Sequence, residues 1–332
     1  TTDVLRSAHE IFADIALREL GVDFEDIDIG KGYITGNYNY NQWYYDFTIN
    51  KKINSKKLVE GLASVSPFIP RFDNIGKFKI DVIRPEYANF DVLATDAQNN
   101  GAGASDNHII KDSDVIDFSF SKTKIEDVNT KVILKYNWNY GKGEFDSSFE
   151  VTVILPDILP EGVDGVDWLS LDDYIPDYKH EFYGLDLDNS ESTYIIDDDR
   201  GKYIRDKATA REFATWFLLQ HCNQHLIIKI RLPLKYMNLE IGDIVQFDEV
   251  VGGVKPYGLN YKKDNNVTPN GQAYFSHFMV TETNKTLEYC EISCIQMHNL
   301  TEEHIVASEP ETGAAGGGTD VAFTGCTDPN AD

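Results

Sequence analysis

The sequence has no long apolar run and is short of basic residues. Its longest apolar stretches, such as 216–219 and 226–228, fall far below the ~20 residues of a membrane-spanning helix, so no membrane insertion is expected. Thirty Lys and Arg residues against 55 Asp and Glu give a net charge of −25. Because such a charge repels a phosphate backbone, we do not expect sequence-specific nucleic-acid binding.

Cysteine is also scarce, with four residues at positions 222, 290, 294 and 326. On a strand, Cys290 and Cys294 would share one face but stand ~13 Å apart, too far for a disulfide between them. The spacing C-x3-C without a second pair is not typical of a zinc site. We therefore expect buried structural cysteines.

The common catalytic motifs are missing. There is no nucleophile elbow, phosphate-binding glycine loop or dinucleotide fingerprint, and residues 141–143 predict a two-glycine hairpin turn. His221 and His225 have the spacing of a helical zinc pair, but the helix is ending there, so hydrogen bonds to backbone groups are expected instead. The sequence thus predicts no catalytic residue, cofactor or metal, although paired carboxylates for glycoside hydrolysis stay open among 55 acidic residues.

From Asp186 onward, oxygen-bearing side chains follow at alternate positions, as in a calcium-binding loop. The sixth position is Glu191 rather than glycine, and the twelfth is Asp197 rather than a bidentate glutamate. An EF-hand is not expected. Looser calcium binding by the surrounding acidic segment remains the alternative to a solvated surface.

The length of 332 residues, with 42% hydrophobic and 12% aromatic residues, predicts a globular chain of two domains or one large β-rich domain. It begins with Thr1 and ends within Gly325–Asp332, so we expect a processed chain or an excerpt from a longer polypeptide.

Three helices follow from apolar spacing of three and four residues. The first carries Leu5 to Leu20, with Thr2 as a possible N-cap and Gly21 as its stop. The second starts at Asn54 or Ser55 and ends before Pro67, and the third runs from about 206 to 222, with Phe213 and Phe217 on its apolar face. Alternating apolar residues predict strands over these ranges: 68–72, 77–83, 115–121, 128–140, 149–155, 225–232, 241–247, 273–281 and 286–298. Hairpin turns are predicted at 73–76, 141–143 and 284–285.

The fold class is therefore α+β and mostly β. We expect an α+β N-terminal domain followed by a β-barrel clasped by one long helix, divided as follows: 1–97 N-terminal domain; 98–110 boundary loop; 111–156 and 200–300 β-barrel; 157–199 acidic insertion; 301–332 flexible linker and the start of a truncated segment.

Two segments are candidates for contact with other proteins. An aromatic run is expected to serve self-association or packing, although it could also stack sugars: Tyr38, Tyr40, Trp43, Tyr44 and Tyr45. The acidic insertion 157–199 has 14 acidic residues against one lysine. We expect it to be an arm that docks on a partner through its apolar side chains: Trp168, Leu169, Tyr174, Ile175, Phe182 and Tyr183.

Three stretches together resemble the hub and tail-tip proteins of tailed bacteriophages. They are the helix from 2 to 21, residues 53–78 with Phe68-Ile69-Pro70-Arg71-Phe72, and residues 210–243, which end in Leu239-Glu240-Ile241-Gly242-Asp243. The terminal residues 325–332 are similar to a short repeat of marine bacteria and their phages.

The resemblance implies a virion tail protein without catalysis. It would form a ring, commonly a trimer, that joins the tail tube to a spike or fibre and lets DNA pass. An acidic channel wall would keep DNA from sticking, which suits the net charge. Two alternatives stay open: a carbohydrate-binding adhesive module that uses the aromatic run, and an envelope-degrading hydrolase.

Overall fold

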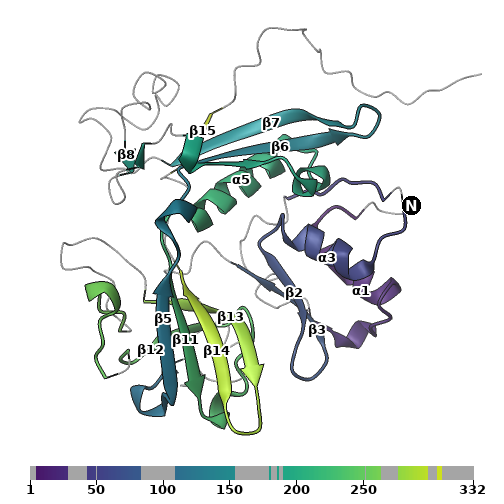
Figure 1. The fold of residues 1–332 in the computed structure, drawn as a ribbon. Coiled ribbons are helices and arrows are strands. Elements are labelled where there is room, and N and C mark those ends of the chain that lie inside the picture. Colours follow the sequence, from purple (N-terminus) through teal and green to yellow (C-terminus); the bar gives the residue numbers. More distant parts are fainter. Residues whose placement is uncertain are drawn as a thin grey trace, which may run out of the picture.

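The computed structural model describes residues 5–28, 43–49, 51–83, 109–153, 179–180, 185–186, 190–250, 252–262, 276–297 and 305–308 (Figure 1). This part of the chain contains three α-helices: α1 (Ala8–Arg18), α3 (Ser55–Ala63) and α5 (Lys207–His221). None of these helices is long and apolar enough to cross a membrane.

The strands form sheets of three, four, six and two strands. The three-stranded sheet is β1 (Ile27–Asp28), β3 (Phe78–Val82) and β2 (Phe68–Phe72). The four-stranded sheet is β10 (Thr193–Ile196), β6 (Lys131–Asn139), β7 (Glu144–Val153) and β15 (Ile305–Ser308). The six-stranded sheet is β4 (Ile109–Ile110), β12 (Ile244–Phe247), β13 (Phe278–Lys285), β14 (Cys290–Gln296), β11 (Leu226–Leu232) and β5 (Asp117–Lys122). The pair is β8 (Lys179–His180) and β9 (Leu185–Asp186).

Local contacts set the first residue of each N-terminal helix. Asn54 caps α3 by accepting the Lys56 N–H at 2.9 Å, as predicted. Helix α1 starts later than expected, at Ala8 rather than near Thr2, which lies outside the described residues. The reason is that Arg6 and Ser7 are extended: the Arg6 carbonyl accepts the Tyr45 N–H at 2.9 Å, and Ser7 forms a bridge with Tyr44.

Helix α5 covers one face of the four-stranded sheet (Figure 1). Asp206 caps it by accepting the Thr209 N–H at 2.8 Å. Phe213 and Phe217 are buried, as predicted, but their helix lies on β6 and β7 rather than clasping the six-stranded sheet. This core also contains buried side chains of α1, α3, β2 and β3, so the N-terminal elements and α5 form one unit.

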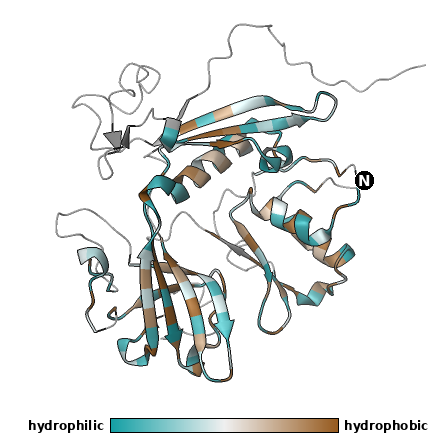
Figure 2. Cartoon of the chain, viewed as in Figure 1, coloured by the Kyte–Doolittle hydropathy of each residue, from teal (hydrophilic) through white to brown (hydrophobic). Residues whose placement is uncertain are grey.

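The six-stranded sheet curls into a half-barrel around a second core. Its end strands β4 and β5 are joined by residues 111–116, which span at most ~25 Å and hold the two edges near each other. Along β14, Cys290, Ile292 and Cys294 point into this core while the residues between them are partly exposed. Figure 2 shows the same alternation of apolar and polar residues along its strands.

The mixed α+β, mostly-β fold is thus confirmed, but the two cores divide the chain differently from the expected ranges. β6, β7 and α5, expected in the barrel domain, pack with the N-terminal helices. Two segments expected to be irregular contribute strands: β10, at the end of the acidic insertion, pairs with β6, and β15, in the expected flexible linker, pairs with β7. Ile196 of β10 is buried because its apolar side chain completes the first core.

Candidate interaction site

The two units meet where two hairpins come together. Asp73 shapes the turn between β2 and β3, because its carboxylate accepts the N–H groups of Ile75 and Lys77 at 2.9 and 2.8 Å. Gly76 follows with φ +87°, a conformation that favours glycine. The neighbouring Asn74 side chain then accepts a hydrogen bond of 2.8 Å from Nζ of Lys285, at the end of β13.

Glu240 joins the two units through its carboxylate. It forms an ion pair with Arg71 of β2, accepts the Asn74 N–H at 2.8 Å, and lies 3.8 Å from Nζ of Lys79 on β3. The side chains of Glu240 and Arg71 are only 13% and 12% exposed. Burial alone raises the pKa of Glu240, but the Asn74 N–H and the two cations outweigh it and hold this pKa below its usual value.

The turn that carries Glu240 is itself fixed to the six-stranded sheet. The Glu240 N–H donates to the Asp243 carboxylate at 2.8 Å, and Gly242 takes φ +91°. Gly242 N–H donates to the Val280 carbonyl, and the Val280 N–H donates to the Asp243 carbonyl, both at 2.8 Å. Glu240 therefore stands on a rigid support.

Large apolar side chains are exposed around this junction. Ile75, in the β2–β3 turn, is 79% exposed, and Leu287, in the β13–β14 turn, is 96% exposed. Phe24 is 78% exposed beside the same hairpin, where the neighbouring Glu25 carbonyl accepts a hydrogen bond from Lys77 Nζ. We use the name hairpin-tip patch for the five exposed apolar residues in or beside the segments that meet at this junction: Phe24, Phe72, Ile75, Ile241 and Leu287. Apolar side chains gathered on a rigid support are typical of a surface that docks on another protein.

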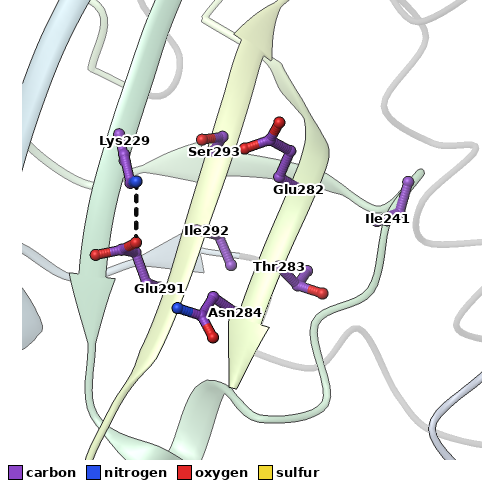
Figure 3. A pocket seen from close by; sticks show the side chains of 8 residues that line it. All are labelled: Lys229, Ile241, Glu282, Thr283, Asn284, Glu291, Ile292 and Ser293. Atoms are coloured by element: carbon purple, nitrogen blue, oxygen red, sulfur yellow. Dashed lines mark ion pairs between the residues drawn. The ribbon is translucent and has the colours of Figure 1, made fainter. Parts of the chain in front are cut away.

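A polar hollow of about 410 Å³ adjoins the patch on the outer face of the six-stranded sheet (Figure 3). Its lining residues are Lys229, Ile241, Glu282, Thr283, Asn284, Glu291, Ile292 and Ser293. Lys229 and Glu291 point toward each other at one side of it, 3.0 Å apart. Hydrogen bonds from Lys229 and Arg231 lower the pKa of Glu291, so it is ionised at neutral pH. The lining contains no aromatic side chain on which a sugar ring would stack.

The aromatic run is split between core and surface. Trp43 and Tyr45 are buried in the first core, where the Tyr45 hydroxyl donates to the Val65 carbonyl at 2.9 Å. Tyr44 is 40% exposed. Tyr38 and Tyr40 lie outside the described residues. Two of the three described aromatics therefore pack inside the protein, where they cannot stack on a carbohydrate.

The arm residues proposed for docking all lie outside the described part of the chain: Trp168, Leu169, Tyr174, Ile175, Phe182 and Tyr183. So do positions 187–189 of the possible calcium loop that begins at Asp186. Its twelfth position, Asp197, lies 3.5 Å from Lys135 Nζ.

The two histidines are used within the fold. The ring nitrogens of His225 lie 2.7 Å from the Gln296 carbonyl oxygen and 2.8 Å from that of Gln220, which confirms the predicted backbone hydrogen bonding. His221 packs on Phe217, with ring centroids 4.2 Å apart. Burial, together with the nearby His225 and Arg200, lowers the pKa of His221 to about 4 and keeps it neutral at pH 7.

The described cysteines are buried: Cys222, Cys290 and Cys294. Burial raises the pKa of each. Within the described ranges, no group of three or more His, Cys, Asp or Glu side chains is arranged to hold a metal ion.

Sequence reasoning missed the junction, although the sequence carries a signal for part of it. Ile75 lies between Asn74 and Gly76, and Leu287 lies between Thr286 and Glu288, so each is an apolar residue in a polar turn. An apolar residue in that position has no core to enter and indicates a contact surface. Glu240 gives no such signal, because its partners are 161 and more positions away in the chain.

Comparison with known proteins shows similarity at the level of structure, not of sequence. No protein-family model matches the sequence, and no curated protein matches it. Among solved structures, a chain titled "Virion of native gene transfer agent (GTA) particle" matches with a TM-score of 0.40 and 10% sequence identity. The match covers 85% of this chain and 55% of that chain, so this chain spans about half of the other's length. A similarity at this level assigns no function.

Proposed function

We propose that this chain is a structural virion protein without catalysis of its own. It acts as a tail hub or tail-tip component: copies form a ring, most simply a trimer, that joins the tail tube to a spike or fibre and lets DNA pass. Its partners are further copies of itself and the neighbouring tail proteins. The resemblance of residues 53–78 and 210–243 to such proteins supports this role.

The observation that carries the proposal is the hairpin-tip patch. Its members come from both units, and the junction at Glu240 fixes the two hairpins relative to each other. A preorganised surface loses little conformational entropy when a partner covers it. Ile75 and Leu287 project from turns and contribute apolar area without filling either core. A docking surface of this kind suits an assembling protein.

The charge of the chain supports the same role. A protein beside a DNA channel gains from an excess of acidic residues, because they repel the phosphate backbone and prevent it from sticking. The net charge of −25 provides that excess.

Two pairs of substitutions test the proposal. Ile75→Ser with Leu287→Ser removes apolar area from the patch, whereas Ile116→Ser with Ile195→Ser removes exposed isoleucines elsewhere, 57% and 52% exposed. Both pairs are expected to leave the unfolding free energy within ~1 kcal/mol of wild type, since all four side chains are exposed.

Sedimentation velocity or mass photometry then measures assembly. We expect the patch pair to weaken ring formation at least about tenfold and the control pair to assemble as wild type does. Equal assembly of both pairs would remove the support that the patch gives to the proposal.

A further inference from the structure

The described surface contains a region that is rich in cations, although the whole chain is strongly acidic. Four of the seven residues at 51–57 are lysines, and further cations stand at the start of α5. We call this region the basic face; its exposed members are Lys51, Lys52, Lys56, Lys57, Arg205 and Lys207. In a chain of net charge −25, such a concentration of cations calls for an explanation.

Backbone pairing brings these cations together. Tyr45 forms a bridge with Ile204, the Asp46 N–H donates to the Tyr203 carbonyl at 3.1 Å, and the Tyr44 N–H donates to the Thr209 hydroxyl at 2.9 Å. The segment that leads to the lysines therefore runs along the start of α5. Helix α3 in turn packs against residues 199–203.

The acidic side chains of this region are already engaged. Asp206 caps α5 by accepting the Thr209 N–H, and Asp46 lies 3.7 Å from Arg6. Lys51, Lys52 and Lys57 make no ion pair with any described residue. Their charge is therefore available to a partner.

The positions of the lysines are unfavourable for the isolated chain. Lys56 and Lys57 lie in the first turn of α3, Lys207 is the first residue of α5, and neither first turn contains an acidic residue. Cations at a helix N-terminus oppose the helix dipole, which favours negative charge there. This arrangement becomes favourable when an anionic group covers the two helix starts.

Apolar side chains lie among these cations. Tyr44, Ile49, Ile53 and Tyr140 are exposed, and the Arg205 guanidinium lies 5.7 Å from the centre of the Tyr140 ring. Two hydrogen bonds between the Tyr140 hydroxyl and the Thr48 backbone, of 3.1 and 3.2 Å, hold this ring beside the segment. The surface thus suits an acidic peptide that also carries aromatic and aliphatic side chains.

The chain itself contains such a peptide. Residues 154–178 include no Lys or Arg, and their acidic residues are Asp157, Glu161, Asp164, Asp167, Asp172, Asp173 and Asp177. They also include Trp168, Leu169, Tyr174 and Ile175. We propose that the basic face of one copy binds residues 154–178 of a second copy. This inference rests on the proposed function, whose ring would be joined by the contact.

The β6–β7 hairpin places the donor segment and the basic face at opposite ends of one rigid element. Strand β7 ends at Val153, the residue that precedes 154–178 in the sequence, whereas Tyr140 stands beyond the other end of that strand. Ten residues of strand separate the two ends by ~30 Å. A donor and an acceptor at opposite ends of a rigid element give a head-to-tail contact, which closes into a ring when the rotation allows.

Two full-length variants separate the donor from the acceptor. The acceptor variant carries Lys51→Glu, Lys52→Glu, Lys56→Glu and Lys57→Glu. The donor variant replaces the seven acidic residues of 154–178 by Asn or Gln. A charge-matched control reverses exposed lysines on the other unit, with Lys111→Glu, Lys124→Glu, Lys255→Glu and Lys262→Glu.

Sedimentation velocity at low salt measures self-association. The donor variant alone and the acceptor variant alone are each expected to associate at least about 30-fold more weakly than wild type, and the control is expected to have an association constant within about threefold of the wild-type value. Mixed one to one, the donor and acceptor variants are expected to form a dimer, because one intact contact remains between them. That dimer should dissociate as salt is raised.

Three results would overturn the inference. A mixture that stays monomeric while wild type assembles means that residues 154–178 bind elsewhere or fold back on their own chain, and this leaves the proposed function standing. An acceptor variant that assembles as wild type does also means that residues 154–178 do not bind the basic face of another copy, and it leaves the proposed function standing. Tighter binding of single-stranded DNA than of a 154–178 peptide to the donor variant at 150 mM salt would identify nucleic acid as the ligand. If wild type forms no ring, the proposed function is contradicted instead. The dimer of the donor and acceptor variants then still tests the contact between the basic face and residues 154–178.

Discussion

Replacing Glu240 by Leu removes the carboxylate that joins the two units and leaves Arg71 with its charge in a site where its side chain is 12% exposed. Removing one partner of a buried ion pair costs ~3–5 kcal/mol, because the remaining charge loses its compensation. Asn74 also loses the acceptor of its N–H, which adds a part of the cost. Since both side chains retain some contact with water, we expect the lower end, ~3 kcal/mol.

A double-mutant cycle isolates this interaction. Arg71→Leu with Glu240→Leu leaves no unpaired charge between them, and Lys79, whose side chain is 30% exposed, reaches water. We therefore expect the double variant to be more stable than Glu240→Leu alone, with a coupling of ~2 kcal/mol. Lys77→Ala supplies the control, because its pair with Asp26 is exposed and contributes at most ~1 kcal/mol.

Urea unfolding followed by circular dichroism gives these free energies, and hydrogen exchange reports the site directly. The Asn74 amide should exchange faster in Glu240→Leu than in wild type, because it loses its acceptor. A cost below 1 kcal/mol for Glu240→Leu, or an unchanged exchange rate at Asn74, would refute this reasoning.

The pH dependence has a defined sign. The pKa of Glu240 is lower in the folded protein than its usual value of 4.5, so its contribution to stability is complete at neutral pH. That contribution is lost as the pH falls below 4.5 through the folded pKa. The stability difference between wild type and Glu240→Leu should therefore shrink as the pH falls below 4.5. A difference that grows toward acid would contradict the assignment.

Three further outcomes test the packing. Phe213→Ala and Phe217→Ala should each lower the free energy of unfolding by ~3–5 kcal/mol in urea titrations, since both rings are buried; losses below 1 kcal/mol would contradict that burial. Gly201→Ala should cost ~3 kcal/mol because its Cβ would collide with a backbone carbonyl of β6, whereas Gly141→Ala, whose Cβ would make an ordinary contact, should be near neutral in thermal melts. Burial raises the pKa of Cys222 to about 12, so mass spectrometry should find it unmodified by a thiol reagent at pH 8 until denaturant is added.

Local signals in the sequence were sufficient for most of the fold. The sequence predicts helices that begin at Asn54 or Ser55 and at about 206, and the structure confirms both starts, because an N-cap depends only on the next few residues. The predicted turn at 284–285 is displaced: β13 runs on to Lys285, and Thr286 forms the turn by accepting the N–H groups of Glu288 and Tyr289. A register shift between Val280 and Glu282 on β13 is not visible in the apolar pattern.

The features that the sequence does not predict depend on contacts between residues far apart in the chain. Strands β10 and β15 are short, and each exists because it pairs with β6 or β7. The same holds for Glu240, whose ion pair with Arg71 brings together residues 169 positions apart. Ile75 and Leu287 belong to turns that sequence rules identify, but the contact between these two turns depends on how the two units pack.

The state of assembly tests the central claim most directly. Native mass spectrometry of the full chain, from micromolar to tens of micromolar concentration, measures it without a label. The account predicts a closed ring whose mass is an integral multiple of 37.6 kDa, most simply three copies. This ring should persist at physiological salt and should be lost in the Ile75→Ser, Leu287→Ser variant. A chain that remains a 37.6 kDa monomer throughout and binds glycans would contradict it and favour an adhesive module.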